Sequence, residues 1–208
     1  MSVVELQIGG FGGQGVILAG MIIGRGLSLY EDYHVSLTQS FGPEARGSAC
    51  SVQIIISRQP VLYPYLTRPH ILVALSQDAY RRFAPHLRPG GSLIIEQDLV
   101  RPDEGISFDS PPAREGRPAC PAGETRVQLY RVPAMRLAEE LGRKMVLNVV
   151  LVGYFTAVTP LLSPEAARKA VAESVPRGTE SLNLTAFEKG YAFGLSQPST
   201  VPTPALQE

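Results

Sequence analysis

The chain has 208 residues, of which 44% are hydrophobic and 18% charged, and its 19 basic and 19 acidic residues give a formal net charge of zero. This length predicts one globular domain with a substantial core, and the charge balance argues against nucleic acid or an anionic membrane as a partner. No apolar run approaches the roughly 20 residues that span a bilayer, and we see no signal peptide, so we expect a cytoplasmic protein.

The first half of the chain alternates between apolar strands and helices. In order, it predicts a strand at 3–8, a helix at 14–29, strands at 34–38, 49–57 and 70–76, a helix at 77–87 and a strand at 90–97. Strands that alternate with helices form parallel sheets covered by helices. The expected fold is therefore an α/β, Rossmann-like three-layer domain with a mostly parallel sheet.

The second half begins with a segment rich in proline, glycine and charge at 101–125, which we expect to be a long loop. A strand at 125–132 follows, then helices at 133–142, 148–158, 163–175 and 179–194. The apolar segment 148–158 should be buried, and Ser163 and Thr179 are expected to cap the last two helices. We expect residues 1–194 to form the domain and residues 195–208 a loosely ordered tail.

A glycine-rich segment follows the first predicted strand, where Gly10, Gly12 and Gly15 fit the pattern G-x-G-x-x-G. Three interpretations stay open: close packing of strand on helix, an anion or phosphate contact, or a dinucleotide site. The anion contact would involve the residues of the turn, which are Gly10, Gly12, Gly13, Gln14 and Gly15. A nicotinamide site usually has an acidic residue at the end of the second strand, and "SLTQS" has none, which argues against NAD or FAD.

Candidate catalytic and metal-binding residues are few. His34, His70 and His86 do not have metal-ligand spacing, and each is expected to be a surface or edge residue. Cys50 and Cys120 are far apart, whereas an iron–sulfur centre needs about four thiolates. We therefore expect no catalytic residue, no metal and no cofactor in this chain.

A second dense segment, "TQSFGPEARGSACSV" at 38–52, follows the second predicted strand at the sheet edge where ligands bind in open α/β folds. Glu44 and Arg46 are two residues apart and share one side of an extended segment. Gly42 and Gly47 permit unusual backbone dihedral angles. The segment is either a surface loop with a local ion pair or a contact surface for a partner chain.

Together, these segments resemble the gamma subunit of 2-oxoacid:ferredoxin oxidoreductases. "GFGGQGVILAGMII" at 10–23 is similar to that family's opening, and "SFGPEARGS" at 40–48 is similar to its second motif, with Phe41 in place of tyrosine and Ser48 in place of glycine. Further blocks, "LVALSQDAY", "LNVVLVG" and "ESLNLTAFEKGY", follow in the same order. The resemblance covers roughly residues 4 to 194.

The resemblance implies a complex that decarboxylates a 2-oxoacid, transfers the acyl group to coenzyme A and reduces ferredoxin. As the substrate we expect 2-oxoglutarate, or 2-oxoacids in general, with pyruvate as the second choice. Alpha and beta subunits would hold thiamine diphosphate with magnesium, and beta or delta subunits the iron–sulfur clusters. This chain would be non-catalytic alone and would contact its partners through Ser40, Phe41, Gly42, Glu44, Arg46 and Gly47. The alternative is a free-standing α/β protein that binds a nucleotide or anion with the glycine-rich loop.

Overall fold

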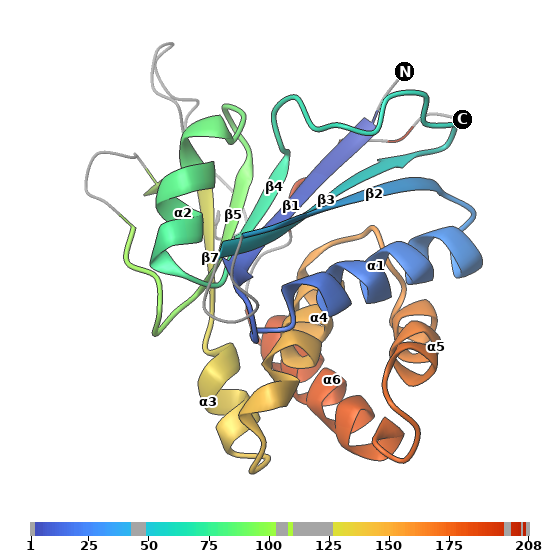
Figure 1. Cartoon of the computed structure of the whole chain (residues 1–208), viewed down its shortest axis with the longest axis vertical. Coiled ribbons are helices and arrows are strands. Elements are labelled where there is room, and N and C mark those ends of the chain that lie inside the picture. Colours follow the sequence, from blue (N-terminus) through green and yellow to red (C-terminus); the bar gives the residue numbers. More distant parts are fainter. Residues whose placement is uncertain are drawn as a thin grey trace.

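The computed structural model describes residues 3–42, 49–102, 108–109, 127–197, 201–204 and 206. Its centre is β1 (Val3–Phe11), an extended segment in which Val4, Leu6 and Ile8 are fully buried on one face. Polar residues alternate with them, because successive side chains of a strand point to opposite faces. Figure 1 shows β1 in the middle of a twisted sheet.

The sheet has the strand order β2-β3-β1-β4-β5-β7-β6. The other strands are β2 (His34–Phe41), β3 (Ala49–Ser57), β4 (Ile71–Ala74), β5 (Ser92–Glu96), β6 (Phe108–Asp109) and β7 (Val127–Val132). From β1 to β6 all neighbours are parallel, which confirms the mostly parallel α/β sheet.

One side of the sheet departs from the parallel arrangement. β3 pairs antiparallel with both β1 and β2, so residues 34–57 form a hairpin. The link of residues 42–48 is too short for a parallel crossover, which needs about a dozen residues or more. β2 consequently runs in the same direction as β1, and both strands end at the same edge of the sheet.

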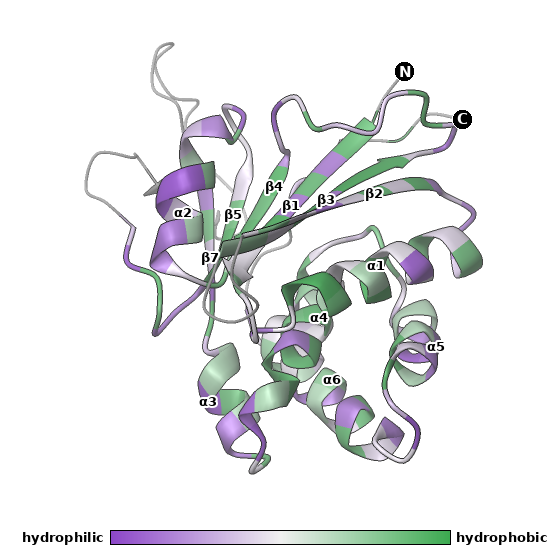
Figure 2. Cartoon of the chain, viewed as in Figure 1, coloured by the Kyte–Doolittle hydropathy of each residue, from purple (hydrophilic) through white to green (hydrophobic). Residues whose placement is uncertain are grey.

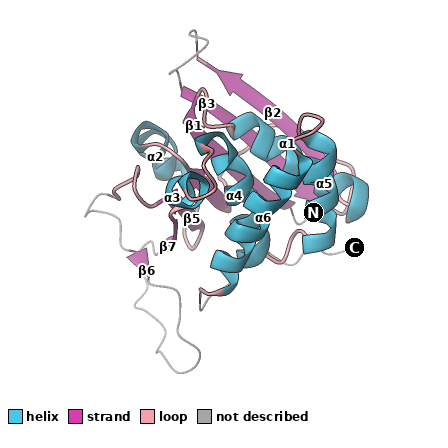
Figure 3. Cartoon of the chain, turned by 90° about the horizontal axis from the view of Figure 1, so that it is seen from below, coloured by secondary structure: helices cyan, strands magenta, loops and turns pink. Residues whose placement is uncertain are grey.

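Helices cover the two faces of the sheet unequally. The helices are α1 (Val16–Tyr30), α2 (Gln77–Phe83), α3 (Ala134–Glu139), α4 (Leu147–Val158), α5 (Pro164–Ser174) and α6 (Glu180–Leu195), with 3-10 turns η1 (Ala84–His86) and η2 (Lys144–Val146). α1, α4, α5 and α6 lie together on one face, and α2 lies on the other (Figures 1 and 3). Figure 2 shows the apolar residues concentrated in the central strands and in α4.

α4 is buried on almost every side, as its apolar sequence predicts. It packs closely on α6 because Gly153 and Gly190 lie where the two helices cross; a Cβ at either would overlap backbone atoms of the other helix. The Ser163 side chain caps α5 by accepting the Ala166 N–H at 3.2 Å, as predicted. Thr179 is the N-cap residue of α6, as predicted, but its hydroxyl donates to the Pro176 carbonyl and makes no side-chain cap hydrogen bond.

The end of the chain touches the domain at two described residues, Val201 and Leu206. Val201, in the segment expected to be loosely ordered, is 1% exposed. Its N–H donates to the Val158 carbonyl at 2.6 Å, at the end of α4. Part of this segment is therefore packed against the helical layer.

Candidate functional site

The carboxyl ends of β1, β2, β4, β5 and β7 meet at one edge of the sheet, the edge at which ligands bind in open α/β folds. α1 leaves β1 toward one face and α2 leaves β4 toward the other, so the switch in winding direction lies between β1 and β4. In dinucleotide-binding folds, the ligand lies across this point. The glycine-rich turn forms its β1 side.

The Gln14 side chain closes this point from within the protein. Its Oε1 atom accepts the Phe11 N–H at 2.7 Å, and its Nε2 atom donates to the Leu75 carbonyl at 2.9 Å. One side-chain amide therefore joins the end of β1 to the end of β4. The Oε1 atom and one Nε2 N–H of Gln14 therefore have backbone partners, and the Phe11 N–H is already used within the turn.

Two glycines of the turn have positive φ angles but different surroundings. Gly13 has φ 102° and no neighbour within 4 Å of a Cβ position. Gly15 has φ 71° and precedes α1, and a Cβ there would lie 2.5 Å from Nδ2 of Asn148 on α4. Asn148 also donates to the Gly15 carbonyl at 3.4 Å. Gly15 thus lets α1 and α4 approach, which is the packing interpretation of the motif.

The second motif begins at the same edge. Cys50 of β3 pairs with Phe41 of β2 on one side and with Gly10 of β1 on the other. The two motifs are therefore separated by one strand. Two strand spacings are about 10 Å. Ser40 and Phe41 are exposed, and Phe41 is 67% exposed, which is unusual for a phenylalanine in a strand. Glu44, Arg46 and Gly47 lie outside the described residues.

A buried carboxylate, which the sequence patterns did not reveal, organises the next part of this edge. Glu96, the last residue of β5, is fully buried. Its Oε2 accepts the N–H groups of Asp98 and Leu99, each at 2.8 Å, and its Oε1 accepts that of Met135 in α3 at 3.1 Å. Three backbone N–H groups thus donate to this carboxylate, so Glu96 positions both the turn after β5 and the start of α3. An acid at the end of an apolar strand was the available signal.

The opposite end of the sheet contains a buried polar cluster. Glu5 accepts the N–H groups of Thr67 and Arg68 through its carboxylate, and its own N–H donates to Nδ1 of His70 at 3.0 Å. Burial, together with the neighbouring Arg88 guanidinium, lowers the pKa of His70 to about 4. The prediction that His70 is a surface or edge residue is wrong, since it is 7% exposed. These hydrogen bonds hold the connection between β3 and β4 against β1.

The described part of the chain offers no donor set for a metal or an iron–sulfur cluster. No three His, Cys, Asp or Glu side chains gather there within reach of one ion. Burial raises the pKa of the Cys50 thiol, and Cys120 lies outside the described residues. Within the same described ranges, no helix is long and apolar enough to cross a membrane.

Comparisons with known proteins match nearly the whole chain. A family model described as pyruvate ferredoxin/flavodoxin oxidoreductase matches residues 5–193. The chain is 42% identical to 2-oxoglutarate synthase subunit KorC of Methanocaldococcus jannaschii, over 90% of this chain and 91% of that protein. It is 30% identical to ketoisovalerate oxidoreductase subunit VorA of Methanothermobacter thermautotrophicus, over 81% of this chain but 31% of that protein.

Solved structures agree with these matches. The keto/oxoacid ferredoxin oxidoreductase gamma subunit of Geobacter sulfurreducens has a TM-score of 0.74 and 32% identity, over 94% of this chain and 98% of that one. The 2-oxoglutarate:ferredoxin oxidoreductase of Magnetococcus marinus, solved with 2-oxoglutarate, coenzyme A and succinyl-CoA, has a TM-score of 0.77. At 20% identity, over 99% of this chain and 34% of that one, it shows the fold alone.

Proposed function

Because the chain belongs to the pyruvate ferredoxin/flavodoxin oxidoreductase family, we propose that it is the gamma subunit of a 2-oxoglutarate:ferredoxin oxidoreductase. The complex converts 2-oxoglutarate to its acyl-CoA by oxidative decarboxylation and passes the electrons to ferredoxin. The observation that carries the proposal is the match along 91% of a separate 2-oxoglutarate synthase subunit, together with the gamma-subunit structure. These similarities favour a subunit over a free-standing nucleotide-binding protein.

Within the complex, this chain would organise partners rather than perform the chemistry. Its described residues hold no cluster of metal-binding side chains, and its buried carboxylates, Glu5 and Glu96, are satisfied by backbone N–H groups. As the family resemblance implies, thiamine diphosphate and the iron–sulfur clusters would be held by alpha, beta and, where present, delta subunits. When bound there, thiamine supplies the decarboxylation chemistry.

The partner interface would include the residues of the second motif, which are Ser40, Phe41, Gly42, Glu44, Arg46 and Gly47. Ser40 and Phe41 are exposed at the carboxyl edge of the sheet, one strand away from the glycine-rich turn. The N–H groups at the start of α1 have no side-chain cap and no acidic neighbour in the first turn. An anionic group of a partner or of coenzyme A would meet these N–H groups, rather than the occupied Gln14 side chain.

Reconstitution tests the proposal. The tagged chain would be co-expressed with thiamine-binding alpha and beta chains from the same genome, and 2-oxoglutarate-dependent, coenzyme A-dependent reduction of ferredoxin measured with and without it. We expect a stable complex, activity that requires this chain, and faster turnover of 2-oxoglutarate than of pyruvate. Full activity without the chain would contradict a subunit role, and preference for another 2-oxoacid would contradict the substrate. Tight nucleotide binding by the lone chain, with no partner retained, would favour the alternative.

A further inference from the structure

The outer side of β2 is an open sheet edge. β2 is the first strand of the sheet, and among the described residues no strand pairs with its outer side. The Gly42 N–H donates to the Ala49 carbonyl, so even-numbered residues of β2 form the hydrogen-bonded pairs with β3. In an antiparallel ladder, the intervening residues point their N–H and carbonyl groups the other way. Val35, Leu37, Gln39 and Phe41 therefore present their backbone groups to the open side.

This edge lacks the features that keep edge strands apart. Natural edges are protected by lysine, proline, bulges or short length. β2 is eight residues long, "HVSLTQSF", is paired with β3 in unbroken register, and carries neither lysine nor proline. The whole chain has a formal net charge of zero, so little electrostatic repulsion opposes the approach of a second copy.

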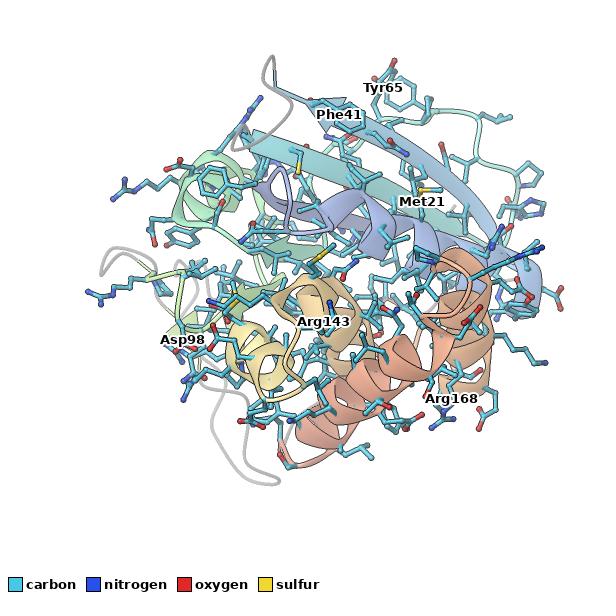
Figure 4. All side chains as sticks on the ribbon, turned by 60° about the horizontal axis from the view of Figure 1, so that its bottom comes forward. Met21, Phe41, Tyr65, Asp98, Arg143 and Arg168 are labelled. Atoms are coloured by element: carbon cyan, nitrogen blue, oxygen red, sulfur yellow. The ribbon has the colours of Figure 1, made fainter. Side chains whose placement is uncertain are left out.

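The apolar core is also incompletely covered on this side. Ile17 of α1 and Val35 and Leu37 of β2 pack on the core but are only partly buried. Met21, one turn before Gly24 on α1, is 49% exposed, and a Cβ at Gly24 would lie 3.5 Å from Leu37. Figure 4 shows Met21 on α1 and Phe41 at the end of β2. An open edge and an apolar helix flank thus form one continuous side, the β2–α1 flank.

The geometry of this flank fits a second copy of itself. α1 lies over β2 and β3, because a Cβ at Gly24 would touch β2 and one at Gly20 would overlap Val52 of β3. If two copies of β2 paired, their α1 helices would be about two strand spacings, or about 10 Å, apart on the same face. Packed helices have interaxial distances of about 8–10 Å. Strand pairing would thus bring the two helices into contact as well.

We propose that the β2–α1 flank is a twofold interface at which two copies of this chain pair their β2 strands antiparallel. In one register, the outward backbone groups of all four residues form hydrogen bonds to the second copy. This register places Leu37 opposite Gln39 and Val35 opposite Phe41 of the second copy. The sheet becomes continuous through the pair, and Met21 is buried between the two helices. Ser40 points to the other face of the sheet and stays available to other subunits, while Phe41 enters the pair through its backbone groups. The pairing goes beyond the proposed function and does not require it.

Light scattering coupled to gel filtration on the full chain measures the pairing. We expect the mass of two chains. Gln39→Pro should give single chains, because it removes an N–H on the open side while the bonds to β3 stay. Met21→Lys should raise the dissociation constant about tenfold or more, by placing a charge between the helices. Each variant has a matched control that should stay paired. Gln39→Ala keeps the N–H that proline removes, and Met145→Lys adds the same charge on η2, at a residue that is 84% exposed.

A cysteine cross-link tests the register independently, in a background with Cys50 and Cys120 replaced by alanine. Thr38 would lie opposite its own copy on the twofold axis, with Cα atoms about 4.5 Å apart, so Thr38→Cys should form a disulfide-linked pair on oxidation. Ser36→Cys, on the same face of β2, would be about 14 Å from its copy and should not. A single-chain mass for the unmodified protein, unchanged pairing in both Gln39→Pro and Met21→Lys, or equal cross-linking at 36 and 38 would overturn the proposal.

Discussion

Replacing Gly15 by alanine tests whether the glycine-rich turn is maintained by packing. At φ 71°, an alanine loses about 1–2 kcal/mol to left-handed backbone strain. The new methyl would also lie 2.5 Å from Nδ2 of the buried Asn148, and relieving that overlap costs about 1–3 kcal/mol. The expected loss in free energy of unfolding is therefore about 2–5 kcal/mol.

Gly13→Ala is the matched control, because it adds the same methyl one residue before Gln14, where no atom lies within 4 Å. Only backbone strain applies there, so we expect a loss of about 1–2 kcal/mol. Urea unfolding followed by far-ultraviolet circular dichroism suits a chain without tryptophan. In thermal unfolding, each kcal/mol should lower Tm by about 2–4 °C. Equal losses for the two variants, or a neutral Gly15→Ala, would refute the packing explanation.

Three further predictions concern ionisable residues. Glu96→Gln should destabilise the chain by about 1.5–3 kcal/mol in urea unfolding, because an amide cannot accept all three N–H bonds; an unchanged midpoint would contradict this. His70 has its folded pKa lowered to about 4, so the unfolded chain is protonated first as pH falls, and the free energy of unfolding should decline from pH about 6.5 to 4 by about 3 kcal/mol. His70→Gln should flatten that decline, and an identical slope would exclude His70 as its source. Arg46→Ala should leave the lone chain folded but weaken the reconstituted complex by about 2 kcal/mol or more; early unfolding with normal assembly would place Arg46 in a structural turn.

Local pattern in the sequence was sufficient for most elements and for the family. β-branched runs predicted β1 and β3, because a strand buried on one or both faces needs such side chains along its length. The apolar segment at 148–158 indicated a buried helix, and Ser163 marked a helix start through its own hydrogen bond. The two glycine-containing motifs, with further blocks in the same order, carried the resemblance to the family.

Strand direction and buried polar contacts depended on the tertiary structure. The sequence of β3 is equally suited to parallel or antiparallel pairing, and only the shortness of the 42–48 link favours a hairpin. The hydrogen bond from Gln14 to the Leu75 carbonyl cannot be read from the local glycine-rich pattern, because 61 residues separate the two. His70 and Glu5 were likewise missed as a pair, since 65 residues separate them.

The sequence by itself therefore determined the element types, the α/β class and the family, because these follow from side-chain periodicity and short motifs that act over one turn or one strand. The tertiary structure alone decided which edge of the sheet remains open, which glycine touches another helix and which polar groups already have hydrogen-bond partners. These depend on residues far apart in the chain being brought within about 3 Å, the range over which hydrogen bonds form. The β2–α1 flank belongs to this second group, because an open edge exists only once the strand order is known.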